Sequence, residues 1–251
     1  MPITIKSARE IELMKEAGRI LEIVHEEMAK ALRPGMSTLE IDKLGEEVIR
    51  SYGCTPSFLN YNGYPASVCV SVNDEVVHGI PSSKRIIKEG DIVGLDAGVI
   101  YKGYHSDAAR THAIGEVSEE AKKLIRVTRE SFFEGIKYAK EGNYLFEISA
   151  AIGKYARERG YGVVRDLCGH GIGAQLHEAP EIPNYEMGRG GVRLRKGMTL
   201  AIEPMINIGT HEVEWLDDDW TVVTADGSLS AHYENTVLIT EGEPVLLTLS
   251  K

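Results

Sequence analysis

The sequence has no long apolar run, no low-complexity linker and no secretory leader. No stretch approaches the roughly 18 consecutive apolar residues that a membrane-spanning helix requires. Residues 1–6 lead directly into a charged helical segment, without the apolar core of a signal peptide. We therefore expect a compact, soluble protein of the cytoplasm with no membrane partner.

Cysteine is also scarce. The three thiols are an odd number, and the spacing of Cys54, Cys69 and Cys168 matches no metal-binding knuckle. This pattern disfavours a disulfide framework and indicates reduced thiols in a reducing compartment.

Positive charge is in short supply, because 38 Asp and Glu residues outweigh 28 Lys and Arg residues and give a formal net charge of −10. Proteins that bind nucleic acid use clustered Lys and Arg side chains to displace counterions from the phosphate backbone. We therefore expect no nucleic-acid partner, and only transient contact with the ribosome.

The chain is long enough, at 251 residues with 43% hydrophobic content, to bury a full core. Two capping-box patterns, Ser7 with Glu10 and Ser37 with Glu40, open two helices in its first half. Each of these helices is expected to end near a glycine, at positions 35 and 53.

The second half repeats this plan. Ser118 opens a helix of about 22 residues that breaks at Gly142, and a further helix runs to Gly160. These two glycines stand 107 positions after Gly35 and Gly53, since 142 − 35 and 160 − 53 both equal 107. We interpret the repeat as an internal duplication within one domain, 1–251, with halves of about 1–115 and 116–251.

Strands follow each pair of helices, and in the first half the pattern predicts them at Val68–Val72, Ile92–Ile100 and His105–Ala113. The fold class is therefore α+β, with two related halves sharing a sheet. A two-residue turn near Tyr101–Gly103 would pair residues whose numbers sum to an odd value. Asp96 and Asp107 would then lie on the same face of the hairpin.

Five widely separated residues carry side chains that bind metals, and several lie in or beside apolar strands. An ionised carboxylate there is costly unless it is paired or bound to a metal. Each residue alone is more often a surface or salt-bridged group, and it is the convergence of all five that indicates a site. They are Asp96, Asp107, His170, Glu203 and Glu234.

Four carboxylates and one imidazole favour Mn, Fe or Co over softer metals, with Zn and Ni as alternatives. Bridging carboxylates can hold two such ions roughly 3.5–4 Å apart, where they polarise a carbonyl and activate a water. The ligand set therefore predicts a two-metal hydrolase.

The glycine-rich segment Gly169–Gly173 is not a dinucleotide-binding loop, because His170 occupies a position where backbone must approach pyrophosphate. The flanking glycines instead allow a tight backbone that aims the imidazole inward.

The chain resembles the type I, bacterial methionine aminopeptidases from about Ile3 to its C-terminus. The matching stretches are Tyr61-Asn62-Gly63-Tyr64-Pro65, Ser71 to Pro81, Gly90-Asp91-Ile92-Val93, Gly169 to Gly173, His177-Glu178-Ala179-Pro180, Gly197 to Pro204, and Gly227 to Glu234. The resemblance implies the "pita-bread" fold and removal of N-terminal methionine from nascent polypeptides, preferentially before a small second residue. It also implies a monomer.

The resemblance implies a role for each metal ligand. Asp107 and Glu234 would bridge two divalent ions, Asp96 would chelate one of them, and His170 and Glu203 would complete the other. Glu203 would also shuttle a proton.

The resemblance further implies two catalytic histidines. His177 would stabilise the oxyanion, and His78 would contact the nitrogen on the leaving side of the scissile bond. His105 and His232 are each two residues from a ligand, on the same strand face, and are candidates for a supporting layer behind the ligands.

The methionine side chain would occupy an apolar pocket similar to that of the family, lined by Phe58, Tyr61, Tyr64, Cys69, His78, His177 and Trp220. Phe58 and Leu176 depart from the family, which often has cysteine and usually has phenylalanine at these two positions. We expect specificity, but not chemistry, to be affected.

Asn73, Glu75 and Ser230 resemble the loop that holds a sodium or potassium ion in the family, mainly through backbone carbonyls.

Two other kinds of protein share features of this sequence. A proline-specific aminopeptidase or prolidase shares all five ligands but usually carries an additional N-terminal domain, for which this chain has no room before Asp96. A binding protein that keeps the fold without metals would have lost ligands, and all five are present here.

Overall fold

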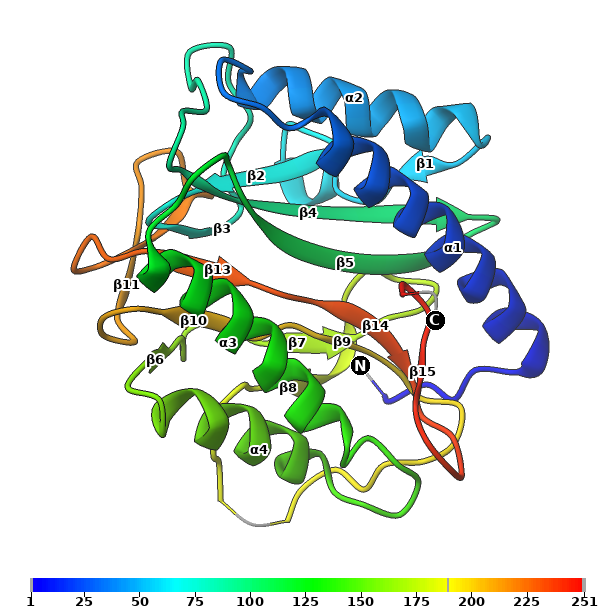
Figure 1. The fold of residues 1–251 in the computed structure, drawn as a ribbon. Helices are drawn as coiled ribbons and strands as arrows, with labels where there is room; N and C mark the ends of the chain where they lie inside the picture. Colours follow the sequence, from blue (N-terminus) through cyan, green and yellow to red (C-terminus); the bar gives the residue numbers. More distant parts are fainter. Residues whose placement is uncertain (1, 189, 250–251) are drawn as a thin grey trace.

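Two pairs of helices lie on the outside of the molecule and strands fill the space between them (Figure 1). The structure is a computed structural model that describes residues 2–188 and 190–249. Helices α1 and α2 cover one side of the strands, and α3 and α4 lie on the other (Figure 1). The helices are α1 Ala8–Ala31, α2 Thr38–Ser51, α3 Glu119–Ile136 and α4 Leu145–Arg157.

Both capping boxes of the first half are confirmed. The Ser7 hydroxyl accepts a hydrogen bond from the Glu10 N–H at the start of α1, and the Glu10 carboxylate accepts one from the Ser7 backbone N–H. Ser37 and Glu40 do the same at the start of α2. Each box satisfies N–H groups that the first helical turn leaves without a partner.

The strands form four sheets, and every strand pair among the described residues is antiparallel. The α+β prediction is therefore confirmed. The sheet orders are β1-β4-β2 with β5 beside β4, β13-β10-β6, β11-β12-β3, and β15-β14-β9-β7-β8. The strands are β1 Thr55–Pro56, β2 Val68–Val72, β3 Glu75–Val77, β4 Ile92–Tyr101, β5 Tyr104–Ala113, β6 Gly162–Val163, β7 Gly169–Gly171, β8 Glu178–Ile182, β9 Thr199–Ile202, β10 Met205–Asn207, β11 Val213–Trp215, β12 Val222–Thr224, β13 Ser230–His232, β14 Asn235–Leu238 and β15 Val245–Leu246.

The β4–β5 hairpin confirms the parity argument. Lys102 and Gly103 form its two-residue turn, both with positive φ, 48° and 87°, as a type I′ turn requires. Residue numbers of paired positions sum to an odd value, so Gly98 lies opposite Asp107. Asp96 is the diagonal neighbour of Asp107, and the two carboxylates share one face.

The helices of each half pack on their own apolar cluster. In the first half, Leu21 and Val24 of α1 and Ile41 of α2 bury their side chains against Leu95 and Val70. A second cluster, around Phe132 and Ile148, joins α3 and α4 to β9 and β14. The division into halves of 1–115 and 116–251 stays a prediction.

Helix α3 is shorter than the sequence predicted. It has 18 residues, with Lys137 as its C-cap, rather than about 22 ending at Gly142. Beyond it, Glu141 N–H donates to Thr240 O and Lys140 forms an isolated bridge with Thr240. Tertiary pairing with the segment after β14 therefore overrides the helical pattern at this end.

Within the described part of the chain, no helix has both the length and the hydropathy needed to cross a membrane.

Candidate metal centre

All five metal-ligand candidates and all seven predicted pocket residues line one cavity of about 210 Å³. Residues that are far apart in the sequence, from both halves of the chain, therefore meet at one place. The predicted residues in its wall are Phe58, Tyr61, Tyr64, Cys69, His78, Asp96, Asp107, His170, His177, Glu203, Trp220 and Glu234.

Hydrogen bonds between β5 and the start of β14 bring Asp107 and Glu234 together. The Thr236 hydroxyl accepts from the Asp107 N–H (2.8 Å) and donates to the Asp107 carbonyl (2.9 Å). Glu234 and Ala109 exchange backbone hydrogen bonds of 3.0 and 3.4 Å. The two halves are therefore joined by their backbones at the proposed bridging carboxylates.

Arg110 reinforces this junction. Its guanidinium donates to the Glu234 carbonyl, to Asn235 Oδ1 at 2.7 Å and to the Thr248 carbonyl at 3.1 Å. It also lies 4.6 Å from the centre of the Tyr233 ring. The backbone on both sides of Glu234 is therefore held by one partly buried cation.

Close packing explains the glycines on either side of His170. A Cβ atom on Gly169 would lie 2.4 Å from the Ala201 carbonyl oxygen, and one on Gly171 would lie 2.2 Å from the Ala179 carbonyl oxygen. Strand β7 can therefore pass between β8 and β9 only with glycine at both positions.

Strands β7 and β9 also position the candidate ligands His170 and Glu203. His170 pairs with Ala201 in β9, and Glu203 follows two residues later on the same face. His170 Nδ1 lies 2.8 Å from the Gly171 carbonyl oxygen, so it carries the proton and leaves Nε2 free to bind a metal.

The ligand atoms converge closely enough to bind metal. One atom each from Asp107, His170 and Glu234 lie within 4.8 Å of one another. His170 Nε2 is 3.6 Å from Glu203 Oε1.

Burial and mutual repulsion make this cluster a poor place for uncompensated negative charge. Burial raises the pKa of Asp96 to about 7 and that of Glu203 to about 8. Burial followed by neighbouring carboxylates raises the pKa of Asp107 and of Glu234 well above the usual range. Divalent cations would relieve this penalty.

Several buried polar atoms of the cluster have no hydrogen-bond partner. Among the described residues these include Asp96 Oδ1, Asp107 Oδ1 and Glu234 Oε1, all belonging to residues that line the cavity. Buried carboxylate oxygens without a donor are well suited to bind a cation. The residues therefore fit a divalent-metal centre.

The other end of the cavity is apolar and aromatic. The Tyr64 and Trp220 rings are 5.1 Å apart, edge to face, and His78 is 6.3 Å from Trp220. Phe58 and Cys69 are buried beside them. A flexible thioether fits such walls.

Two histidines stand at the sides of the cavity. His78 has a φ of 60°, a left-handed conformation that is uncommon outside glycine and tends to occur at functional positions. His177 is exposed, its ring lies 4.2 Å from that of His170, and its Nδ1 is 2.8 Å from the Tyr61 hydroxyl.

The structure separates the two histidines proposed as a supporting layer. His232 Nε2 lies 3.6 Å from Glu203 Oε2, directly against a ligand. His105 is also buried, with Nδ1 3.0 Å from the Ser57 hydroxyl, and it is close enough to affect the pKa of His170, which burial chiefly lowers. Neither of the two histidines lines the cavity itself.

Sequence reasoning missed several residues of the cavity wall. Closeness in sequence to the predicted site could have indicated some of them, because Leu167 and Cys168 come just before Gly169 and Met205 comes two residues after Glu203. The additional wall residues are Asn62, Val77, Leu167, Cys168 and Met205, together with Leu176, which had been noted only as a departure from the family.

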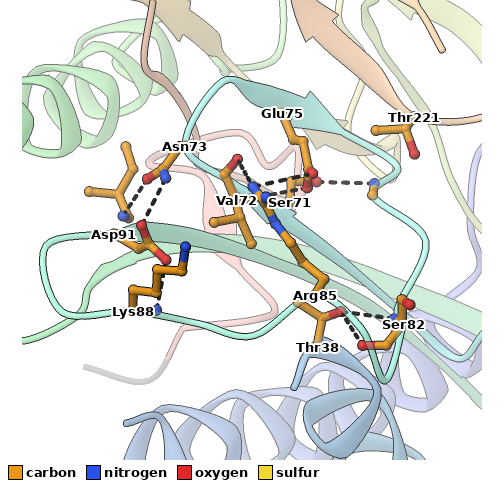
Figure 2. A network of polar contacts seen from close by, with 12 residues as sticks. Thr38, Ser71, Val72, Asn73, Glu75, Ser82, Arg85, Lys88, Asp91 and Thr221 are labelled. Carbon is orange, nitrogen blue, oxygen red and sulfur yellow. Dashed lines mark hydrogen bonds and ion pairs between the residues drawn. The ribbon is translucent and has the colours of Figure 1, made fainter. Parts of the chain in front are cut away.

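The three residues proposed to hold a monovalent cation are not in the wall of the cavity. Figure 2 shows two of them, Asn73 and Glu75, with their polar contacts. The Asn73 side chain donates to Asp91 Oδ1 at 2.9 Å, and the Asn73 carbonyl accepts from the Ser230 N–H at 2.9 Å. Glu75 accepts from the Val72 N–H and lies 3.6 Å from the Arg85 guanidinium. Asn73, Glu75 and Ser230 are therefore in one network, with the two side chains already paired within the protein.

Known proteins share both the sequence and the fold. Residues 12–241 match metallopeptidase family M24. A methionine aminopeptidase from Clostridium acetobutylicum is 54% identical over 247 residues, which cover 98% of this chain and 99% of that protein. One from Bacillus subtilis is 49% identical, with 95% and 96% coverage.

Solved structures agree. A crystal structure of methionine aminopeptidase from Thermotoga maritima has a TM-score of 0.97 and 45% identity, covering 99% of this chain and 100% of that one. An Xaa-Pro dipeptidase from Bacillus anthracis has a TM-score of 0.80 and 30% identity, but only 62% of that chain is covered. These likenesses confirm the pita-bread fold. The chain belongs to metallopeptidase family M24 and, within it, to the methionine aminopeptidases.

Proposed function

We propose that the protein removes the N-terminal methionine from peptides and nascent proteins by metal-dependent hydrolysis, preferentially when the second residue is small. The observation that carries this proposal is the single cavity that combines five metal-ligand side chains with an aromatic, sulfur-containing apolar wall. One end suits hydrolysis of an amide, and the other suits a methionine side chain.

Five residues would hold two divalent ions. Asp107 and Glu234 would bridge them, Asp96 would chelate one, and His170 and Glu203 would complete the other. Bound Mn, Fe or Co, with Zn or Ni as alternatives, would polarise the scissile carbonyl and activate a water.

The remaining chemistry belongs to side chains of this chain. Glu203 would accept a proton from the attacking water and pass it to the leaving amine. His177 would donate a hydrogen bond to the developing oxyanion, and His78 would contact the nitrogen of the leaving side. Burial lowers the pKa of His78 to about 4, so this imidazole is neutral at pH 7.

Phe58 and Leu176 would tune the choice of substrate. The Phe58 ring packs against Gly98, where a Cβ atom would lie 3.1 Å from its Cε1 atom, and Leu176 is buried in the same apolar cluster. Both side chains line the cavity, so they would shape the space for the methionine thioether.

Asn73, Glu75 and Ser230 would bind one sodium or potassium ion through backbone carbonyls. The Gly79 N–H donates to the Ser71 hydroxyl at 3.2 Å, which ties the segment after β3 to β2 and so would keep His78 in place. We further propose that the protein acts as a cytoplasmic monomer, meets nascent chains through transient ribosome contact, and binds no nucleic acid or membrane. Co-sedimentation with ribosomes at physiological salt tests the contact, which should be weak and lost at higher salt.

The decisive experiment strips the protein of metal and restores Mn(II), Fe(II) or Co(II) in turn. Cleavage of Met-Ala-Ser, Met-Lys-Ser and Ala-Pro-Ser peptides is followed by mass spectrometry. Metal-dependent loss of methionine from the first peptide alone supports the proposal. Cleavage of the proline peptide alone would identify a proline-specific enzyme, and no cleavage with any metal would indicate a binding protein. Glu234→Gln tests the site, with the exposed Glu212→Gln as its matched control.

A further inference from the structure

We propose that Tyr61 is a positioning residue that keeps the proton of the His177 ring on Nε2. This inference rests on one part of the proposed function, namely that His177 donates a hydrogen bond to the oxyanion. The contact itself is direct, because the Tyr61 hydroxyl lies 2.8 Å from His177 Nδ1. The two ring centres are 5.2 Å apart.

The proton balance decides the direction of this hydrogen bond. A neutral imidazole has one N–H, so one nitrogen must accept where the other donates. Burial raises the pKa of the Tyr61 phenol, so its hydroxyl keeps its proton at neutral pH. The proton of this hydroxyl can therefore be donated to Nδ1, which lies 2.8 Å away.

The accepting Nδ1 leaves the proton on Nε2. This nitrogen points away from Tyr61, and the ring that carries it lines the cavity beside His170. The opposite tautomer would present a lone pair at Nε2, which repels a developing oxyanion instead of stabilising it. Tyr61 therefore selects the one tautomer of His177 that can assist the reaction.

A stiff loop presents the Tyr61 hydroxyl. The Tyr61 N–H donates to Phe58 O at 2.9 Å, the Tyr64 N–H donates to Tyr61 O at 2.9 Å, and the Asn60 N–H donates to Tyr64 O at 2.8 Å. Asn60 and Asn62 have positive φ, 64° and 50°, a conformation that asparagine tolerates better than most residues. The hydroxyl is therefore preorganised before substrate arrives.

Tyr61→Phe isolates the hydroxyl, because the ring stays as part of the methionine pocket. With Mn(II)-loaded protein and Met-Ala-Ser near pH 7.5, we expect kcat to fall about tenfold, the rate equivalent of one ordinary hydrogen bond, with KM nearly unchanged. Tyr155→Phe, which removes a phenol hydroxyl bonded to Glu130 between α3 and α4, serves as the matched control and should leave both constants unchanged.

A double-mutant cycle separates positioning from simple loss of packing. If Tyr61 acts through His177, Tyr61→Phe should have no further effect on kcat in a His177→Ala background. Losses that multiply independently in the double variant would overturn the inference.

Nitrogen-15 NMR of the metal-free protein reads the tautomer without any assay of activity. The wild-type spectrum should show a bare Nδ1 and a protonated Nε2 for His177, and Tyr61→Phe should shift the resonances toward a mixture of tautomers. A wild-type ring protonated at Nδ1 would refute the inference. Failure of the proposed function is recognised separately, as absence of methionine release by the wild-type protein with every metal.

Discussion

Removal of the metals should make the stability of the protein fall as the pH rises from about 6.5 to about 8. In the folded, metal-free protein the pKa of Asp96 is raised to about 7 and that of Glu203 to about 8, while those of Asp107 and Glu234 are raised further above their usual range. The unfolded chain releases these protons near pH 4. The folded state therefore holds more protons, and its free energy of unfolding decreases with rising pH.

The pH window avoids most of the competing effect of the histidines. Their lowered pKa values make the folded state bind fewer protons than the unfolded chain, an effect that fades above about pH 6.5 as the histidines of the unfolded chain lose their charge. Across the rest of the window the carboxylates dominate. The histidines concerned are His25, His78, His105, His112, His170, His177 and His232.

The expected effect is large. Each proton held only by the folded state lowers the free energy of unfolding by about 1.4 kcal/mol per pH unit. Two such protons between pH 6.5 and 8 give a loss of about 4 kcal/mol, which corresponds to a Tm lower by roughly 8–16 °C for a chain of this size.

Thermal melts of chelator-treated protein at constant ionic strength measure this slope. Saturating Mn(II) should raise Tm and abolish the decline, because the ions take the place of the protons. Glu203→Gln should reduce the metal-free slope by up to one proton, and Glu212→Gln should leave it unchanged. A metal-free Tm that stays constant or rises across the window would refute the reasoning.

Three further substitutions test the framework of the site. Gly171→Ala forces a Cβ atom against the Ala179 carbonyl, and urea unfolding should show that the free energy of unfolding falls by about 1–3 kcal/mol. Calorimetric titration of this variant should show weaker Mn(II) binding. Gly242→Ala, where the added Cβ atom meets open space, is the control and should show neither change. Arg110→Ala removes one donor from each of three buried acceptors and should cost about 3 kcal/mol by urea unfolding, so a neutral result would remove Arg110 from the junction. Ser7→Ala removes the N-cap of α1 and should cost about 1 kcal/mol with Mn(II) affinity unchanged, and a loss of affinity would contradict the separation of this cap from the site.

Local patterns were sufficient where structure is decided locally. The hydroxyl and carboxylate of Ser7 and Glu10 identify a helix start because their hydrogen bonds lie within one turn. The parity of Asp96 and Asp107 was readable because a two-residue turn fixes the register of the whole hairpin.

Long-range contacts were not readable in the same way. The end of α3 was misjudged because Lys140 pairs with Thr240, a partner 100 positions away. The hydrogen bond between Tyr61 and His177 joins residues 116 positions apart, and neither residue type predicts this contact. His105 and His232 shared one sequence signal, yet their contacts differ, since His232 lies 3.6 Å from Glu203 and His105 lies 3.0 Å from Ser57.

The hydrogen bonds between β5 and Glu234 have a consequence for how the protein matures. Asp96 and Asp107 lie on one side of that junction, and His170, Glu203 and Glu234 lie on the other. A chain whose halves have not docked, or have docked out of register, therefore offers no complete ligand set and gains no binding energy from the ions. If these residues hold the ions as proposed, metal binding would stabilise only correctly assembled molecules.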